Sequence, residues 1–377
     1  MRLRILLLLL AISSSVFAYI PSEQAKLSVL TCGSGQKVYK VYGHSAIRYQ
    51  DPEKNLDIVY NYGVFSFDEP HFILRFIRGY NYYLLGREHY KQFIQRYRRG
   101  GESVQEQDLN LTHEEVKALI TALEINAQPE NRKYLYNVLL DNCATRVYEI
   151  LERELEGGLI WANQCEDASY RDLLHEYNGL MPFSQLGIDI VFGTKADQKI
   201  NCREQMFLPE KLMEQLADAR KHDGSLLVAQ TRVLVTGSSI QNLKEKVLFH
   251  LVFGLLLLSS LFFRFRYTKG LRGFRIVLYS LLGLASLVVV FIAFFSIHPT
   301  VWPNLNLIWI NPLWLIIAIA LLTRKETRPF WQKCLNSWAI IIALFLILGL
   351  AGVFFIHYGL IYILSSIIIV SYKKVRA

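Results

Sequence analysis

The stretch LLDNCATRVYEILERELEGG, residues 139–158, predicts a helix with a cysteine in its first turn. Asp141 and Asn142 are good N-cap residues, and apolar residues recur after them at helical spacing until a pair of glycines ends the run. Cys143 falls in phase with this apolar stripe, so we expect its sulfur to face into the fold. Unpaired N–H groups and partial positive charge at a helix N-terminus favour a thiolate over a thiol. The stretch therefore indicates either a catalytic cysteine or a buried structural one.

The chain divides by composition into a polar part and an apolar part. Its 377 residues include 52% hydrophobic side chains and have a mean hydropathy of +0.24. Residues 19–240 are mixed and polar, whereas residues 247–377 are mostly hydrocarbon, which predicts a soluble catalytic domain followed by a membrane domain. Much of the net charge of +9 lies in short loops between apolar runs, which membrane topology explains without a nucleic-acid partner.

The N-terminus has the pattern of a signal peptide. Residues 1–18, MRLRILLLLLAISSSVFA, begin with two arginines, continue as an apolar run and end with Val16 and Ala18, which fit the small-residue cleavage rule. The alternative is a retained anchor helix. In both cases the polar domain that follows is exported.

The apolar part predicts about five membrane-spanning helices. They cover residues 247–263, 276–297, 305–322, 338–356 and 358–372. The last is short, although it is nearly free of charge. Basic residues gather at 264–275, 324–333 and 373–376 and alternate with weakly charged turns. Because basic loops stay in the cytoplasm, we expect a multi-pass inner-membrane protein with a periplasmic catalytic domain and a cytoplasmic C-terminus.

A histidine upstream is the best partner for Cys143. Two β-rich runs, VYGHSAIRYQ and LDIVYNYGVFSF, are joined by an Asp-Pro-Glu-Lys-Asn turn and predict a hairpin. His44 opens the first strand between two small residues, and Asn61 lies on the second strand. A thiolate nucleophile needs a base, and that base needs an orienting group. We therefore expect His44 to serve Cys143 and Asn61 to orient His44, with Asp57 as the competing choice for the third residue.

The other cysteines bear on whether Cys143 is a free thiol. The chain has five cysteines and no Cys-x-x-Cys pair, which argues against a zinc ribbon or a thioredoxin-type motif. We expect no metal and no cofactor. Cys165 and Cys202 could pair in an oxidising periplasm, which would leave Cys143 free. Cys32 has no evident partner in the exported part and is the reserve candidate for a reactive thiol.

Two features suggest contact with lipid. A few polar residues lie in or near the expected outer leaflet: Asn306, Asn311, His357 and His298. Intramembrane polar groups are costly and often functional, yet asparagines also pair helices, so a substrate-contact role and a structural role are both open. The Asn311–Pro312 pair predicts a kinked helix. Residues 72–101, rich in aromatics and arginine, indicate either a segment near lipid head groups or an ordinary solvated face.

The order of these features resembles that of known enzymes. A strand histidine, a second strand with a polar residue, and an Asn-Cys pair that opens a helix resemble the permuted papain-like enzymes. Within that group, GHSAIRY and NCATRV are similar to motifs of the lecithin:retinol acyltransferase-like proteins. A longer resemblance is to the Lnb N-terminal periplasmic domain family, that of the Bacteroides-type lipoprotein N-acyltransferase. It rests on LTCGSGQKVYKVYGHSAIR, NYGVFSFDEPHF, DNCATRVYEIL and, in the apolar part, HPTVWPNLNLIWINPL.

This resemblance implies a fold and an activity. The fold would be an α+β permuted papain-like (NlpC/P60-like) periplasmic domain followed by an all-α multi-span membrane domain. Cys143 would be the nucleophile and His44 its base, and the backbone N–H of Cys143, with Tyr42 or Asn142, would bind the oxyanion. The enzyme would move an acyl chain from phospholipid, through a cysteine thioester, to the N-terminal amine of a diacylglyceryl lipoprotein.

Three other functions remain open from the residues alone. A cell-wall cysteine peptidase would use the same thiol, but a hydrolase of soluble polymer has little need of a membrane bundle. A phospholipase would share the first chemical step and let water finish the reaction. A non-catalytic membrane scaffold would not need the thiol.

Overall fold

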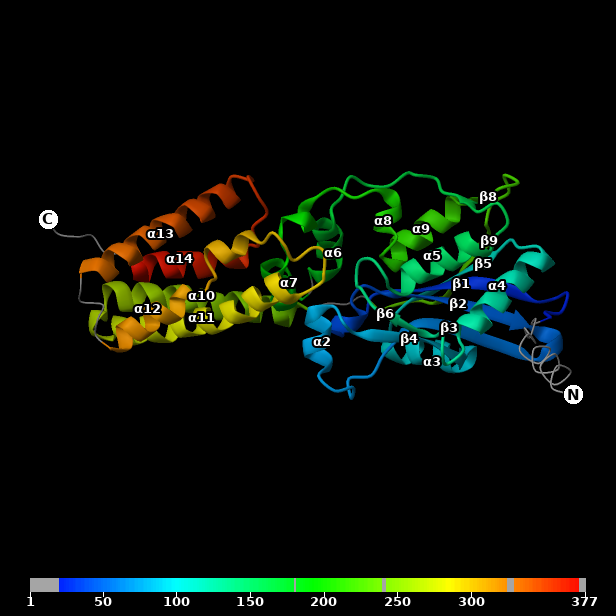
Figure 1. The fold of residues 1–377 in the computed structure, drawn as a ribbon, viewed down its shortest axis with the longest axis horizontal. Coiled ribbons are helices and arrows are strands. Elements are labelled where there is room, and N and C mark those ends of the chain that lie inside the picture. The colour runs from blue at the N-terminus through cyan, green and yellow to red at the C-terminus, as the bar shows by residue number, and fades with distance from the viewer. Residues whose placement is uncertain (1–19, 180, 239–241, 324–328, 373–377) are drawn as a thin grey trace, which may run out of the picture.

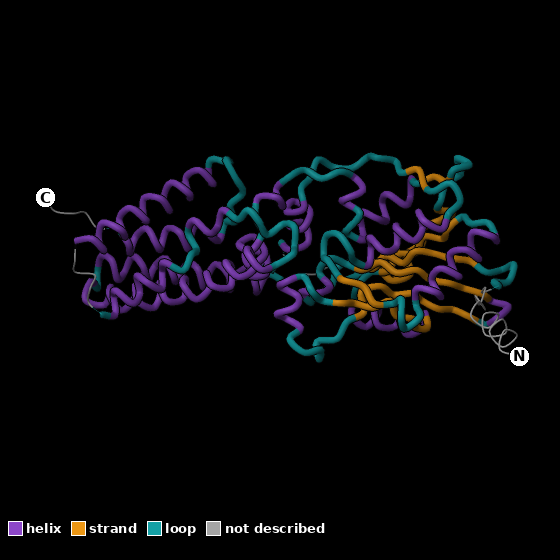
Figure 2. Tube along the Cα trace, viewed as in Figure 1, coloured by secondary structure: helices purple, strands orange, loops and turns teal. Residues whose placement is uncertain are grey.

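The computed structural model describes residues 20–179, 181–238, 242–323 and 329–372. The signal peptide predicted for residues 1–18 lies outside the described residues, as do the basic tail and part of the basic stretch at 324–333. Figures 1 and 2 show two parts, a sheet covered by helices at one end of the molecule and a helical bundle at the other. The first part is a mixed α/β domain, and the second is a bundle of apolar helices.

The sheet of the first part has seven antiparallel strands in the order β6-β4-β3-β2-β1-β5-β9. The strands are β1 (Lys26–Cys32), β2 (His44–Asp51), β3 (Leu56–Val64), β4 (Tyr82–His89), β5 (Val104–Leu109), β6 (Lys133–Leu135) and β9 (Val228–Val235). Two short strands, β7 (Leu159–Ile160) and β8 (Arg220–Lys221), pair separately. The predicted hairpin is confirmed as β2 and β3, whose turn closes with Asn55 in the left-handed region at φ 52°.

Helices cover both faces of the sheet. The helices of this part are α2 (Phe72–Arg78), α3 (Tyr90–Gly100), α4 (His113–Asn126), α5 (Cys143–Glu154), α6 (Tyr170–Asn178), α7 (Pro182–Val191), α8 (Cys202–Gln205) and α9 (Pro209–Asp218), and only some of them pack on the sheet. One apolar core joins α4, α5 and α9 to the sheet. A smaller core on the other face contains Phe93, Ile94 and Tyr97 of α3. The sheet is therefore sandwiched, which explains why β1 is buried along nearly its whole length.

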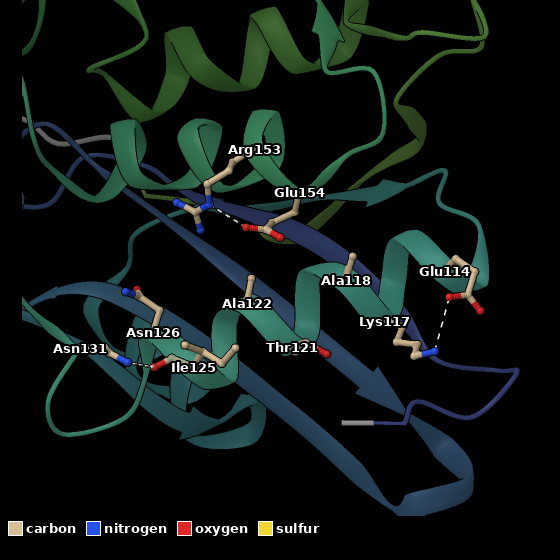
Figure 3. A pocket seen from close by; sticks show the side chains of 10 residues that line it. All are labelled: Glu114, Lys117, Ala118, Thr121, Ala122, Ile125, Asn126, Asn131, Arg153 and Glu154. Carbon is tan, nitrogen blue, oxygen red and sulfur yellow. Dashed lines mark hydrogen bonds and ion pairs between the residues drawn. The ribbon is translucent and has the colours of Figure 1, made fainter. Parts of the chain in front are cut away.

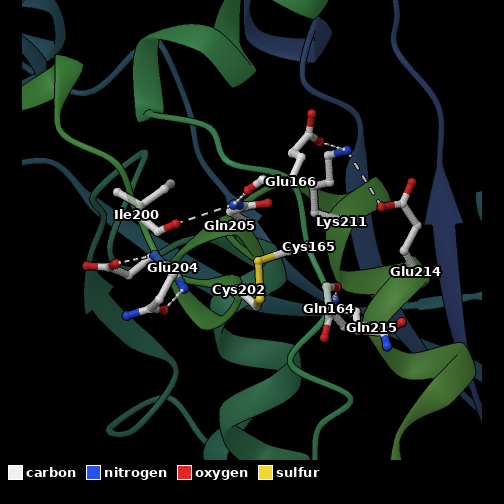
Figure 4. The surroundings of a disulfide bond; sticks show 11 residues. Gln164, Cys165, Glu166, Ile200, Cys202, Glu204, Gln205, Lys211, Glu214 and Gln215 are labelled. Atoms are coloured by element: carbon white, nitrogen blue, oxygen red, sulfur yellow. Dashed lines mark hydrogen bonds and ion pairs between the residues drawn. A yellow bond between two sulfur atoms is a disulfide. The ribbon is translucent and has the colours of Figure 1, made fainter.

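A disulfide joins Cys165 to Cys202, a pairing that the sequence allowed but did not prove (Figure 4). It closes a loop with a sequence separation of 37 residues. It ties the extended segment after α5 to the start of α8. Disulfides persist in oxidising compartments. Cys143 has no part in this bond and is a free thiol.

The second part is a bundle of α10 (Leu243–Phe265), α11 (Leu271–Phe295), α12 (Leu313–Leu322), α13 (Pro329–Leu350) and α14 (Gly359–Ser371). Four stretches of the described residues are long and apolar enough to cross a membrane: Leu243–Phe265, Thr268–Phe295, Leu305–Leu322 and Phe330–Leu350. The predicted fifth span corresponds to the shorter apolar helix α14 (Gly359–Ser371). The third span begins as a separate 3-10 turn, Leu305–Ile308, so Asn311–Pro312 marks a break before α12 rather than a kink within it.

The short helix α14 has 13 residues. At about 1.5 Å per residue it measures roughly 20 Å, less than the roughly 30 Å hydrocarbon core of a bilayer. Most of its residues are buried among α10 and α13 rather than facing outward. Its last residues, Val370 and Ser371, bond to Arg275 and Tyr279 in the first turns of α11. The chain thus returns along α14 to the end of the bundle where α10 and α11 connect.

A polar joint connects the two parts. The amides of Asn304 and Asn306 donate to backbone carbonyls at the end of α7, at 2.9–3.2 Å. The backbone N–H of Gly193 donates to the carbonyl of Thr300 at 2.7 Å. Beneath these bonds, buried Arg171 pairs with Asp189 at 2.6 Å. The joint therefore holds α7 against the outer end of the bundle.

Candidate active site

The N-terminus of α5 positions Cys143. The Asn142 side-chain oxygen accepts from the backbone N–H groups of Ala144 at 2.8 Å and Thr145 at 3.1 Å. The Thr145 hydroxyl accepts from the backbone N–H of Asn142 at 2.7 Å, which completes a capping box. Cys143 is thus the first helical residue, as predicted. Figure 1 shows α5 beginning at the end of the α/β part that faces the bundle.

The start of β2 positions His44. His44 lies opposite Cys32 in the antiparallel register of β1 and β2. Gly43, directly before it, has φ 75°, and a Cβ there would lie only 2.5 Å from the carbonyl oxygen of Cys32. Only glycine combines this left-handed conformation with so close an approach. Gly43 therefore sets the position at which His44 enters the strand.

His44 and Cys143 meet, and Asn61 lies behind the imidazole. The Cys143 and His44 side chains are neighbours: a Cβ built on Gly63 would lie 3.9 Å from Cβ of Cys143 and 3.9 Å from Cε1 of His44, and each group shifts the pKa of the other. The Nε2 atom of His44 lies 2.5 Å from the side-chain oxygen of Asn61. This leaves Nδ1 of His44 for the sulfur. The structure thus brings together three residues that the sequence predicted, and it turns the competing candidate, Asp57, to a bidentate pair with Arg48 at 2.8 Å.

The orientation of the Asn61 side chain is determined by two residues behind it, Glu88 and Arg96. Its side-chain nitrogen donates to Glu88 at 3.1 Å, so its oxygen must face His44 and accept the proton of Nε2. Glu88 is held in turn by Arg96, with two bonds of 2.6 and 3.0 Å. The row Arg96–Glu88–Asn61 therefore specifies which nitrogen of His44 carries its proton when the ring is neutral.

The electrostatics favour an ion pair. Burial raises the pKa of the Cys143 thiol, but the neighbouring His44 and the backbone N–H groups of Ser45 and Ala144 outweigh burial and leave that pKa below its usual 9.0. Burial lowers the pKa of His44, but the charge and hydrogen bond of Cys143 and the bond to Asn61 outweigh it and raise the pKa above 6.5. Thiolate and imidazolium stabilise each other, as a cysteine nucleophile requires.

The other site candidates of the first domain, Asn142, Tyr42 and Cys32, are engaged in other interactions. The side-chain nitrogen of Asn142 donates to the carbonyls of Val138 and Phe207, so both ends of its amide serve the cap and neither can bind an oxyanion. The Tyr42 hydroxyl accepts from Asn178 at 2.8 Å, and burial raises the pKa of Tyr42 to about 12. Cys32 is buried in the same small core as Tyr97, and burial raises the pKa of its thiol, which does not suit a reactive thiol.

The candidates in the membrane part make structural contacts. His298 bonds through Nε2 to the carbonyl of Phe76 at 3.0 Å and so joins the end of α11 to α2. Asn311 donates to the carbonyls of the preceding 3-10 turn and accepts from the backbone of Leu313, which starts α12. His357 is buried and accepts from the backbone of Gly359 at 2.9 Å. None of these bonds involves Cys143 or His44.

A surface hollow of about 720 Å³ lies elsewhere, between α4 and the last turn of α5 (Figure 3). Lys117, Thr121 and Arg153 are among the side chains around it. The hollow adjoins the C-terminal turn of α5. Cys143 is the first residue of this 12-residue helix, so it lies roughly 16 Å from the hollow along the helix axis. It holds no thiol or imidazole, so we assign the chemistry to the Cys143 end.

We predict that Asn61→Ala lowers acyl transfer on the order of 100-fold, because a base that loses its orienting partner spends less time in the reactive geometry. The pH profile should also change. Activity of an ion pair rises as Cys143 ionises and falls as His44 loses its proton, and the bond to Asn61 raises the pKa of His44. The alkaline limb should therefore move to lower pH in Asn61→Ala, as measured by initial rates between about pH 5 and 10.

Asp57→Ala is the matched control, because it removes the competing residue from the same strand. It should leave both limbs of the pH profile in place. A shift of the alkaline limb in Asp57→Ala, with none in Asn61→Ala, would reverse the assignment of the third residue.

A partly buried thiol–imidazole pair on an α/β domain that is joined to a bundle of long apolar helices defines a membrane-associated protein with a candidate active site outside the bundle. Comparison with known families gives two matches. The Lnb N-terminal periplasmic domain matches residues 15–177, and the Lnb transmembrane domain matches residues 242–377. The chain therefore belongs to the Lnb family, which suggests a membrane-associated enzyme of lipoprotein modification. No curated protein and no solved structure matches it.

Proposed function

We propose that the protein is a lipoprotein N-acyltransferase of the inner membrane, with a cysteine thioester as its intermediate. The observation that carries the proposal is the thiol–imidazole pair at a helix N-terminus, on a domain fastened to a membrane bundle. The catalytic residues are Cys143, His44 and Asn61. The donor is a phospholipid, and the acceptor is the N-terminal amine of a diacylglyceryl lipoprotein.

The reaction has two steps. In the first, the Cys143 thiolate attacks the ester carbonyl of the phospholipid, and the imidazolium of His44 gives its proton to the departing glycerol oxygen. Lysophospholipid leaves, and the acyl chain remains on sulfur as a thioester. In the second, the neutral α-amine of the lipoprotein attacks the thioester, His44 accepts its proton, and the amide leaves with the acyl chain. The thiolate and imidazolium are then restored.

The order of the site residues supports a permuted papain-like fold for the exported domain. His44 starts β2, Asn61 lies on the neighbouring strand β3, and Cys143 opens a helix later in the chain. We infer a signal peptide at residues 1–18, a periplasmic catalytic domain at 19–240 and a membrane domain at 247–377. With the basic loops in the cytoplasm, the C-terminus would also be cytoplasmic.

The attachment of α2 to the bundle supports lipid access to the site. The backbone N–H of Ile297, just after α11, donates to the carbonyl of Arg78 at 3.0 Å. The helix α2 thereby lies at the end of a spanning helix, with Ile73 74% exposed and Leu74 also exposed. Drawing an acyl chain into water costs about 0.8 kcal/mol per methylene. A site held at the bilayer surface avoids that cost, and restricted access of water protects the thioester.

Full-length protein reconstituted in phosphatidylethanolamine vesicles, with a synthetic diacylated lipopeptide, tests the proposal. We expect equal amounts of lysophospholipid and N-acylated lipopeptide by mass spectrometry, and an acyl group on Cys143 when the lipopeptide is omitted. Free fatty acid without N-acylated product would indicate a phospholipase. Cleavage of cell-wall peptides without any change in lipid would indicate a peptidase. Either result overturns the proposal.

The same distinction can be made in cells. A strain without its lipoprotein N-acylating enzyme should regain triacylated lipoproteins when it expresses the wild-type chain but not the His44→Ala variant. Equal complementation by His44→Ala at equal abundance would argue against His44 as the base.

A further inference from the structure

One buried hydroxyl near the thiol has no partner. Tyr134, on the edge strand β6, is only 7% exposed, and its hydroxyl oxygen makes no hydrogen bond to any group in the described part of the chain. Most buried polar groups in proteins are paired, and an unpaired one is unfavourable. A hydroxyl left unpaired beside a reactive thiol is therefore a donor for a group that arrives with the substrate.

Gly63 shows that this hydroxyl borders the site. A Cβ built on Gly63 would lie 3.9 Å from Cβ of Cys143, 3.9 Å from Cε1 of His44 and 4.0 Å from the hydroxyl oxygen of Tyr134. The nucleophile, the base and the hydroxyl thus surround one point, which a side chain would occupy if residue 63 were not glycine. Gly63 has φ 89°, so a larger residue is disfavoured there by the backbone as well.

We propose that the Tyr134 hydroxyl donates a hydrogen bond to the oxyanion that forms when Cys143 attacks a carbonyl, and that the carbonyl group occupies the space at Gly63. This inference rests on the proposed acyl transfer and names its oxyanion donor. The tyrosine keeps its proton throughout, and no bond to it is made or broken. The backbone N–H of Cys143 completes the oxyanion site.

The surroundings of Tyr134 suit a donor of this kind. Burial, and after it the charge of Cys143, raises the pKa of Tyr134, which keeps the hydroxyl protonated. The ring is fixed by Tyr62, whose centroid lies 6.1 Å away in an edge-to-face arrangement, and by the Arg146 guanidinium at 4.5 Å. Arg146 is itself held by Asp141 through two bonds of 2.5 Å. The hydroxyl is therefore preorganised by contacts to the ring that do not involve its oxygen.

Asn142 and Tyr42, the two side chains that the sequence suggested as oxyanion donors, fit this role less well than Tyr134. The Asn142 amide is fully used in the helix cap. The Tyr42 hydroxyl accepts from Asn178 at the end of α6 and is not among the nearest neighbours of the Gly63 space. Among the three, Tyr134 alone combines an unused donor with a position at the Gly63 space.

Tyr134→Phe removes the hydroxyl and keeps the ring. We expect acylation of Cys143 by 4-nitrophenyl butyrate, followed as the burst of nitrophenolate from full-length protein in detergent, to slow about 100- to 1,000-fold. Alkylation of Cys143 by iodoacetamide at neutral pH should stay within about twofold of wild type, because displacement at a saturated carbon develops no oxyanion. Acylation at the wild-type rate overturns the inference. An equal loss of acylation and alkylation would show a structural role and also overturns it.

Tyr62→Phe is the matched control. Tyr62 packs against Tyr134, but its hydroxyl donates to Asn126 at 2.8 Å. Both rates should remain near the wild-type values in this variant. If wild-type protein acylates Cys143 but forms no N-acylated lipopeptide, the proposed acceptor fails while the role of Tyr134 stands. If wild type is not acylated at all, both fail.

Discussion

Cys143→Ala should reduce acyl transfer at least about 10⁴-fold, because no other described group in the site can carry the acyl chain. Cys143 occupies the first position of α5, where alanine is compatible with the helix and with the capping by Asn142 and Thr145. The thermal midpoint should therefore change little. Transfer is measured as N-acylated lipopeptide from phosphatidylethanolamine vesicles, and integrity as the thermal unfolding of the purified protein.

Two further variants test whether Cys143 is the residue that carries the acyl group. Cys143→Ser keeps the shape of the side chain but cannot form an ion pair with His44 at neutral pH, since the pKa of a hydroxyl is far above that of a thiol. It should be nearly as inactive as Cys143→Ala. Cys32→Ala tests the reserve thiol: because Cys32 is buried in the small core, this change should cost stability and leave transfer measurable. An acyl group found on Cys32 rather than on Cys143 would contradict the assignment.

Asp189→Ala should destabilise the protein by about 3 kcal/mol, which corresponds to a fall of roughly 6–12 °C in the thermal midpoint. Asp189 accepts from the guanidinium of Arg171 at 2.6 Å and from His175 at 2.9 Å. Arg171 is 4% exposed, so water cannot replace the lost carboxylate. Asp197 stays as its one remaining carboxylate partner among the described residues.

Because Asp189 lies at the joint between the two parts, its substitution can also be followed by the rate of proteolysis. Its backbone carbonyl accepts from Asn306 at the joint between the two parts, so loosening of α7 should increase proteolysis between the α/β part and the bundle. Asp167→Ala is the matched control, because Asp167 is an 87% exposed side-chain partner of Lys199 at 3.7 Å. Such a pair contributes about 0–1 kcal/mol. Equal thermal midpoints for the two variants would show that the buried pair does not hold the joint.

The hairpin register explains which third residue the structure selects. Asp57 and Asn61 are four positions apart on β3, so strand alternation places both on the same face and cannot separate them. The register pairs Asp57 with Gln50 and Tyr60 with Ile47. Asn61 therefore lies towards the His44 end of β2, and Asp57 lies about 13 Å further along at 3.3 Å per residue. In the sequence, the two residues remained alternatives.

Other parts of the site had no local signal. Glu88 and Arg96 support Asn61 from β4 and α3, and Tyr134 reaches the site from the far edge strand β6. Nothing in their neighbouring residues distinguishes them from ordinary members of an aromatic or charged stretch. The length of the fifth apolar helix also had no local signal: α14 has 13 residues and packs among other helices.

The sequence by itself determined the features that depend on neighbouring residues: the capped helix that begins at Cys143, the hairpin that begins at His44, and the division into a polar part and an apolar part. Capping, alternation and hydropathy act over a few residues, so they can be read from the order of the chain. Only the tertiary structure decided that Asn61 rather than Asp57 lies against His44 and that Tyr134 borders the thiol. Those contacts join strands and helices far apart in sequence, and their geometry exists only once the sheet and its core have packed.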